Sequence, residues 1–183
     1  MHHSRLRFGL CFVLGGAAFA HAAFAEEPQM GPVIKNYGPV FAVPESRFAL
    51  DQQAGRKVVF DVAQSPEDSA ALNRRLESVA RYLNMHARAG IDTDRFDIAV
   101  VLHGKASWNA LSDVAYRQRF DGDNPNTGLI TALKAAGVDF WLCGQSAGFN
   151  GIASSELSGH VNLALSAMTV LQDLQAKGYA LLP

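Results

Sequence analysis

Short apolar runs alternate along the chain with segments of helical periodicity. The runs at residues 57–63, 97–102, 138–143, 161–165 and 179–182 are rich in Val, Phe, Leu and Ala, and they predict five β-strands. The run at 97–102, DIAVVL, has almost no polar alternation, which is typical of a strand buried on both faces. Strands that alternate with helices predict an α/β fold, here a three-layer sandwich around a mainly parallel sheet of about five strands.

The longest helix is predicted between the first two strands. Ser65 suits a helix cap, Pro66 suits the first helical position, and Asp68 fills the acidic position of a capping box. Gly90 is expected to end the helix. Within this helix, apolar residues recur at spacings of three and four and form one stripe, which consists of Leu72, Leu76, Val79, Leu83 and Ala87.

Shorter helices are predicted between the later strands. One lies at about 107–113, and a second runs from 127 to 136, where Gly137 follows. A third begins after Ser166, which suits a cap, and ends before Gly178. The segment 144–151 is predicted to be a Gly-rich loop.

The first 25 residues resemble a secretory signal peptide. Arg5 and Arg7 form a basic start, residues 8–20 form an apolar run, and Ala23-Phe24-Ala25 is an A-x-A cleavage pattern. We therefore expect cleavage after Ala25, a periplasmic location and no membrane span in the mature chain. An uncleaved anchor is the alternative.

Residues 26–56 are predicted to form an extended arm ahead of the α/β domain at 57–183. Pro28, Pro32, Pro39 and Pro44 exclude a continuous helix, yet the segment is too apolar for a free tail. The arm is expected to pack on its own domain or on a neighbouring subunit, and a partly disordered linker is the alternative.

The composition and net charge of the chain argue against several classes of binding partner. The chain has 183 residues with a formal charge of −1, and removal of Arg5 and Arg7 would make it more acidic. Such a protein has no electrostatic footprint for nucleic acid or anionic membrane. His86 and His160 show no metal-ligand spacing with Cys143, and residues 148–151 lack the Lys and the spacing of a phosphate loop. We expect no metal site and no cofactor.

Cys143 is the candidate reactive residue, because cleavage after Ala25 would remove the other cysteine, Cys11. Cys143 ends one predicted strand and His103 follows another, and the ends of parallel strands lie along one edge of the sheet. A histidine near a thiol favours the nucleophilic thiolate, and the loop at 144–151 could supply backbone N–H groups that stabilise an anion. The alternative is a Cys143 that only fills space in the core.

Several short motifs together resemble one family, the DsrE/DsrF-like family, over residues 57–183. The motifs are Arg81-Tyr82-Leu83-Asn84, Val100-Val101-Leu102-His103-Gly104, Asn124-Pro125, Leu142-Cys143-Gly144-Gln145-Ser146, Ala164-Leu165-Ser166-Ala167-Met168 and Gly178-Tyr179. The resemblance implies a compact α/β fold with a parallel sheet that assembles into homo- or hetero-oligomers. Characterised relatives act in cytoplasmic sulfur relay, in which a cysteine carries persulfide sulfur between proteins.

Two functions follow from this resemblance, and turnover as an enzyme stays open in both. In the first, the protein handles sulfur in the periplasm: Cys143 accepts persulfide sulfur from a donor protein or a small sulfur compound, and His103 tunes its thiolate. Gly144, Gln145, Ser146 and Asn84 are then the expected binding residues. In the second, the protein is a non-catalytic binding protein or an oligomeric scaffold of the same fold. A homo-oligomer is expected in either case.

Overall fold

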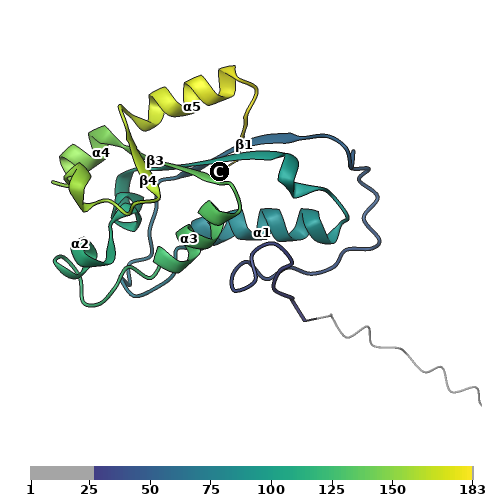
Figure 1. Cartoon of the computed structure of the whole chain (residues 1–183), viewed down its shortest axis with the longest axis horizontal. Coiled ribbons are helices and arrows are strands. Elements are labelled where there is room, and N and C mark those ends of the chain that lie inside the picture. Colours follow the sequence, from purple (N-terminus) through teal and green to yellow (C-terminus); the bar gives the residue numbers. More distant parts are fainter. Residues whose placement is uncertain (1–26, 183) are drawn as a thin grey trace, which may run out of the picture.

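A parallel β-sheet organises the structure, a computed structural model that describes residues 27–182 (Figure 1). The sheet has five strands in the order β4-β3-β2-β1-β5, and every neighbouring pair is parallel. The predicted α/β class with its parallel sheet is confirmed. The strands are β1 (Arg56–Val62), β2 (Phe96–Leu102), β3 (Asp139–Cys143), β4 (Val161–Ala164) and β5 (Ala180–Leu182).

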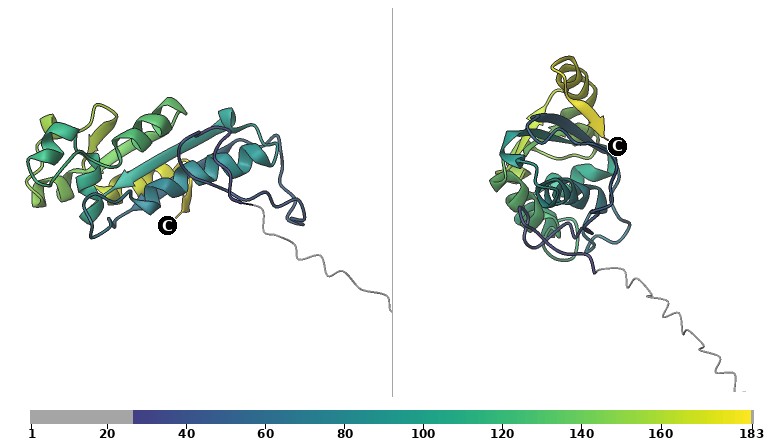
Figure 2. Two further views of the ribbon diagram at one scale, coloured as in Figure 1. Left: turned by 90° about the horizontal axis from the view of Figure 1, so that it is seen from below. Right: turned by 90° about the vertical axis from the view of Figure 1, so that its right-hand side faces the viewer.

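Helices cover the two faces of the sheet unequally (Figures 1 and 2). On one face α1 (Arg74–Arg88) and α3 (Thr127–Ala135) pack against each other and over a large buried core. On the other face α5 (Ala167–Ala176) contacts β1, β2 and β3. The buried cluster there is small, and its members are Val59, Ala99, Val101, Cys143 and Ala167. Side chains at the rim of this second face therefore stay close to solvent.

The helix α1 begins later than the sequence predicts. Ser65 does not cap it; its hydroxyl accepts a hydrogen bond from Asn109 Nδ2 at 2.7 Å instead. The cap is Asn73, whose side chain accepts from the Arg75 N–H at 2.9 Å. The Asn73 N–H in turn donates to Asn126 Oδ1 at 2.8 Å, so a buried side chain 53 residues away fixes the start of the helix. The predicted start at Ser65 is wrong because this tertiary contact outweighs the local signals.

Two other segments also differ from prediction. The single short helix expected at 107–113 is a 3₁₀ helix, η2 (Gly104–Ala110), followed by α2 (Asp113–Arg117). The segment expected as a loop at 144–151 begins with α4 (Gly144–Phe149). Glycine disfavours helices, but Gly144 at the start of α4 lets the backbone approach the Ala164 carbonyl closely. Two further 3₁₀ turns are η1 (Thr93–Arg95) and η3 (Ser154–Glu156).

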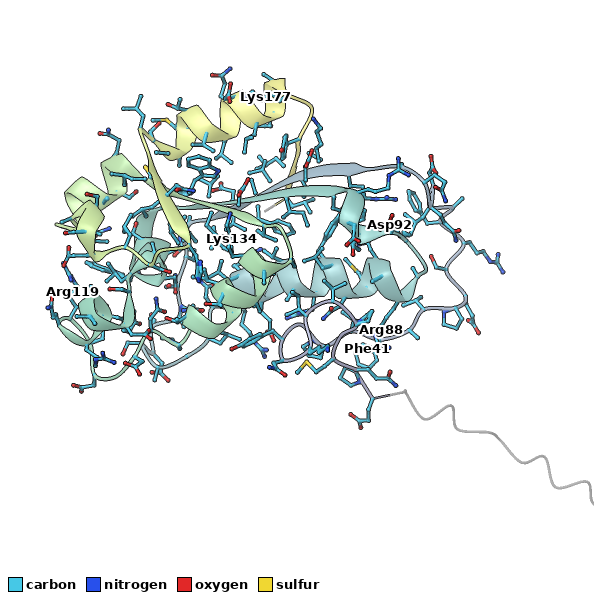
Figure 3. All side chains as sticks on the ribbon, in the orientation of Figure 1. Phe41, Arg88, Asp92, Arg119, Lys134 and Lys177 are labelled. Carbon is cyan, nitrogen blue, oxygen red and sulfur yellow. The ribbon has the colours of Figure 1, made fainter. Side chains whose placement is uncertain are left out.

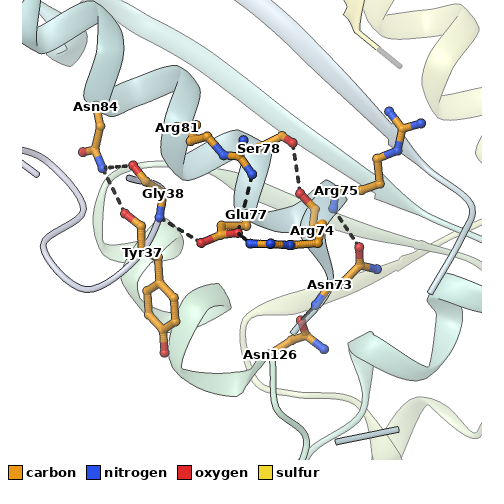
Figure 4. Close-up of polar contacts among 10 residues, drawn as sticks. All are labelled: Tyr37, Gly38, Asn73, Arg74, Arg75, Glu77, Ser78, Arg81, Asn84 and Asn126. Atoms are coloured by element: carbon orange, nitrogen blue, oxygen red, sulfur yellow. Dashed lines mark hydrogen bonds and ion pairs between the residues drawn. The ribbon is translucent and has the colours of Figure 1, made fainter. Parts of the chain in front are cut away.

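The N-terminal arm packs on α1 of its own chain over residues 27–40 (Figure 4). Asn84 Oδ1 accepts from the Ile34 N–H at 2.8 Å, and its Nδ2 donates to the carbonyls of Ile34, Tyr37 and Gly38, each at 3.0 Å. The buried Glu77 carboxylate accepts from the Gly38 N–H at 3.3 Å. These bonds satisfy backbone groups that a strand or helix would otherwise satisfy, which explains how a segment without regular structure is held.

The remainder of the arm is more exposed. Phe41 and Phe48 lie largely in solvent, and a groove of about 350 Å³ separates residues 41–50 from the end of α1. Figure 3 shows Phe41 beside Arg88, which ties the arm to this helix end through the Gly31 carbonyl. Within residues 27–182 no helix combines the length and the hydropathy that a bilayer span needs. The predicted signal peptide, residues 1–25, lies outside the described residues.

Candidate functional site

Three polar or reactive side chains lie at the carboxyl end of the sheet. Val62 of β1, Leu102 of β2 and Leu142 of β3 pair in register, so His103, which follows β2, lies level with Cys143, the last residue of β3. Side chains alternate between the faces of a sheet, and by this alternation Asp61, His103 and Cys143 all belong to the face on which α5 packs. The two predicted residues, Cys143 and His103, are thus neighbours across the sheet.

The backbones stay together beyond the strand ends as well. The N–H of Gly104 donates to Ser146 Oγ at 3.1 Å, and Asn150 Nδ2 donates to the Gly104 carbonyl at 3.4 Å. These bonds link the segment after β2 to α4, which follows β3. Gly104 has a φ of +55°, a conformation that favours glycine, and this turn directs its N–H toward Ser146.

The sulfur of Cys143 is nearly enclosed but lies among hydrogen-bond donors. The residue is 5% exposed and packs in the small cluster below α5. Burial is the largest influence on the thiol, and it raises the pKa. The N–H and the hydroxyl of Ser146, with the N–H groups of Ala167 and Gln145, favour the thiolate and bring the pKa of Cys143 below its ordinary value.

These donors come from two helix starts that meet at the sulfur. Gln145 and Ser146 belong to the first turn of α4, and Ala167 is the first residue of α5. The approach of the two helices requires Gly144, because a Cβ at this position would lie 2.6 Å from the Ala164 carbonyl oxygen. The predicted binding residue Gly144 therefore acts as a spacer, and the amide of Gln145 holds the link between β4 and α5 by donating to the Leu165 carbonyl at 3.2 Å.

Asp61, which is not among the predicted site residues, extends the site. Its Oδ1 lies 2.7 Å from His103 Nε2, and the two side chains are 32% and 28% exposed. Among the described residues, no hydrogen bond joins His103 to Cys143 directly. The sequence does hold one signal for Asp61: it is the only charged residue inside the apolar part of β1, VVFDV. A carboxylate in that position needs a polar partner.

A hollow of about 410 Å³ opens beside these residues, between η2 and α4. Ser146 belongs both to its wall and to the surroundings of the Cys143 sulfur. The other side chains in the wall offer a cation, an amide and aromatic surface; they include Lys105, Asn150, Trp108 and Phe149. Lys105 has no ion pair with any residue in the part of the chain that the structure describes. A small anion is the kind of ligand that such a wall can hold.

Asn84, the remaining predicted binding residue, lies elsewhere. It is fully buried on α1, and its amide oxygen and nitrogen are committed to the arm. Asn84 therefore fixes the arm and has no free group to offer a ligand. Over residues 27–182, no three His, Cys, Asp or Glu side chains are grouped so that they could hold a metal ion.

Comparison with known proteins agrees with this architecture. The model of the DsrE/DsrF-like family matches residues 57–183. A solved structure of a protein of unknown function from Methanobacterium thermoautotrophicum is similar, with 20% identity, a TM-score of 0.53 and coverage of 69% of this chain and 97% of that one. The ychN protein from E. coli has 19% identity, a TM-score of 0.48 and coverage of 69% and 96%. No curated protein matches the sequence significantly.

Proposed function

Because the chain belongs to the DsrE/DsrF-like family, we propose that it is an exported, periplasmic sulfur-handling protein whose Cys143 accepts sulfane sulfur as a persulfide. One observation carries the proposal: the only cysteine of the described chain lies at a strand end, among N–H and O–H donors that favour its thiolate. A cysteine that only fills space in a core needs no such donors, since a neutral thiol packs well against apolar side chains.

The reaction requires no oxidant or reductant beyond the donor itself. With thiosulfate, the Cys143 thiolate attacks the outer sulfur atom. A sulfur–sulfur bond to Cys143 forms while the sulfur–sulfur bond of thiosulfate breaks, and sulfite leaves with the electron pair. The donors around Cys143 that favour the thiolate would also favour the persulfide anion, which carries the same charge. Transfer to an acceptor thiolate repeats this exchange.

Intact mass spectrometry tests the proposal on the mature chain. After incubation with thiosulfate and removal of excess reagent, we expect a gain of one sulfur atom that dithiothreitol reverses. The matched control is Cys143→Ser, which preserves size and should gain nothing. An unmodified wild-type mass with both thiosulfate and polysulfide, or the same adduct on Cys143→Ser, would contradict the proposal.

A second function, a non-catalytic small-molecule-binding or scaffold protein, is favoured by one observation, the low exposure of Cys143. Native thiol titration separates the two. If Cys143 reacts in the folded protein faster than a free cysteine at neutral pH, sulfur handling is supported. If it reacts only after denaturation, the second function is supported and the sulfur chemistry is withdrawn.

A further inference from the structure

We infer that Asp61 is a positioning residue for the Cys143 thiol and acts through His103, so that the ends of β1, β2 and β3 align an acid, an imidazole and a thiol. The inference rests on the proposed function, since it concerns how the sulfur-accepting thiolate is made. Asp61 does not touch the reacting sulfur; its contact is with the His103 ring.

The geometry places the three groups in order on adjacent strands. Asp61 Oδ1 is 2.7 Å from His103 Nε2, and His103 is level with Cys143 on the next strand. The Gly104 N–H to Ser146 Oγ bond keeps the two strand ends from separating. The pair of Asp61 and His103 is about one-third exposed, whereas Cys143 is nearly closed to solvent. Solvent therefore reaches the Asp61–His103 pair more readily than the thiol.

The contact with Asp61 determines which imidazole nitrogen of His103 can accept a proton. An ionised carboxylate accepts a hydrogen bond only, so a 2.7 Å contact requires the proton on His103 Nε2. Nδ1 then keeps its lone pair, so it is the ring nitrogen left to take up the proton that Cys143 gives up. The product is a thiolate beside an imidazolium that keeps its hydrogen bond to Asp61. Only a proton moves in this step.

Few other charged groups face this arrangement. Lys105 follows His103 by two residues and lines the hollow between η2 and α4. The helix α4, with the sequence GQSAGF, carries no titratable side chain. On α5 the only charged residue is Asp173, which pairs with Lys177 beyond the far end of the helix at 2.6 Å. At the opposite end of β1 and β2, Lys57 pairs with Asp97 at 3.9 Å. Asp61 is therefore the carboxylate that acts on His103.

The pH dependence of Cys143 alkylation tests the inference. We measure the second-order rate constant with iodoacetamide over a pH series for the wild type, Asp61→Asn and His103→Gln. Both variants should move the titration midpoint of the thiol upward by about one unit, which makes alkylation below the midpoint about tenfold slower. The double variant should be no slower than His103→Gln, because Asp61 acts only through the histidine.

Asp97→Asn is the matched control, since Asp97 is a carboxylate on β2, and by strand alternation it belongs to the same face as His103. Its profile should superimpose on the wild type. A purely structural role for Asp61 would change stability and leave the midpoint in place. The inference is overturned if the Asp61→Asn profile superimposes on that of Asp97→Asn while His103→Gln shifts, or if the two single effects add in the double variant.

A measurement on the wild type covers the case in which Asp61→Asn does not fold. The ¹⁵N chemical shifts of the His103 ring report its tautomer, and we expect a proton on Nε2. A neutral ring with its proton on Nδ1 would refute the inference. The two proposals also fail separately. A sulfur adduct with no Asp61 effect removes only the inference, whereas a shifted pH profile without any adduct removes only the sulfur-handling function.

Discussion

The Cys143 thiol gives the protein a pH-dependent stability whose sign follows from the structure. Its pKa is lower in the folded protein than in the unfolded chain, so between the two values the native state binds fewer protons. Stability should therefore rise with pH across that window. The contribution is lost as pH falls through the lowered native pKa, below which the thiol is protonated in both states.

Ser146→Ala should reduce this slope, because it removes the hydroxyl that favours the thiolate and so raises the native pKa. The Gly104 N–H also loses its acceptor, but that cost is the same at every pH. Urea unfolding at a series of pH values measures the effect. Cys143→Ala, which has no thiol, should remove the contribution, and a Ser146→Ala slope equal to the wild-type slope would contradict the assignment.

Gly144 is a second residue whose role a single substitution can test. The Cβ of Gly144→Ala would lie 2.6 Å from the Ala164 carbonyl oxygen and 3.2 Å from that of Leu165, and both are backbone atoms that yield little. We expect a loss of about 1–3 kcal/mol in the free energy of unfolding. Alkylation of Cys143 should also change, because the start of α5 must move.

The matched control for Gly144 lies in the same helix. A Cβ on Gly148 would meet nothing within 4 Å, so Gly148→Ala should stabilise α4 by about 0.5–1 kcal/mol. Urea denaturation of both variants gives the comparison. Equal changes in the two variants would show that helix propensity, and not the contact with β4, determines the role of Gly144.

At the scale of secondary structure, the sequence predicts best the elements whose pattern is set by burial. The strand at 97–102 is recognised because its residues are apolar on both faces. Ser166 is predicted as a cap because serine favours that position, and in the structure its hydroxyl accepts from the Thr169 N–H. The start of α1 and the existence of α4 are missed. The start of α1 depends on a contact with the distant residue Asn126, and the glycine that opens α4 faces the distant Ala164 carbonyl; no local pattern contains either contact.

The residues of the candidate site also differ in whether a local sequence pattern predicts them. Cys143 and His103 can be brought together from sequence, since each comes at the end of an apolar run and parallel strands end along one edge. Asp61 is missed because its role depends on the pairing of β1 with β2, and a lone acid in a strand does not reveal its partner. Asn84 is predicted as a binding residue, and its contacts with the arm are likewise absent from any local pattern. Its hydrogen bonds reach 46–50 residues back to the arm.

The arm and α1 should therefore behave as one unit that Asn84 holds. Asn84→Ala leaves the Ile34 N–H and several arm carbonyls without their buried partner. We expect a loss of about 2–4 kcal/mol, since each buried polar group left unsatisfied costs roughly 1–3 kcal/mol and some regain water. Limited proteolysis should cut the arm faster than in the wild type, and urea unfolding should give the free-energy change.

An asparagine within the arm provides the control. Asn36 is exposed, and Asn36→Ala should change neither the proteolysis rate nor the free energy of unfolding by more than about 0.5 kcal/mol. If Asn84→Ala digests no faster than Asn36→Ala, other contacts, such as that of Arg88 with the Gly31 carbonyl, hold the arm instead.

At the scale of the whole molecule, the unequal covering of the sheet leaves apolar surface at one edge. The strand β4 is an outer strand, and Leu165, directly after it, is 72% exposed. Met168 in the first turn of α5 is 78% exposed. Between them lies Ala167, which packs on Cys143. Exposed apolar side chains beside an open strand edge are typical of an interface, and a second copy of the chain is the partner we expect.

Substitution at this edge tests the expected homo-oligomer. In the variant Leu165→Asp with Met168→Asp, two buried charges would oppose association, so sedimentation velocity should show a smaller native mass. Phe48→Asp places the same kind of charge on the exposed part of the arm, away from this edge, and should leave the mass unchanged. If Phe48→Asp lowers the native mass and the Leu165/Met168 variant does not, the interface lies on the arm.

Alkylation gives a second test of the same interface. Because Ala167 borders Cys143, dissociation should also speed alkylation of the thiol. An unchanged rate in a dissociated variant would place the interface away from the site.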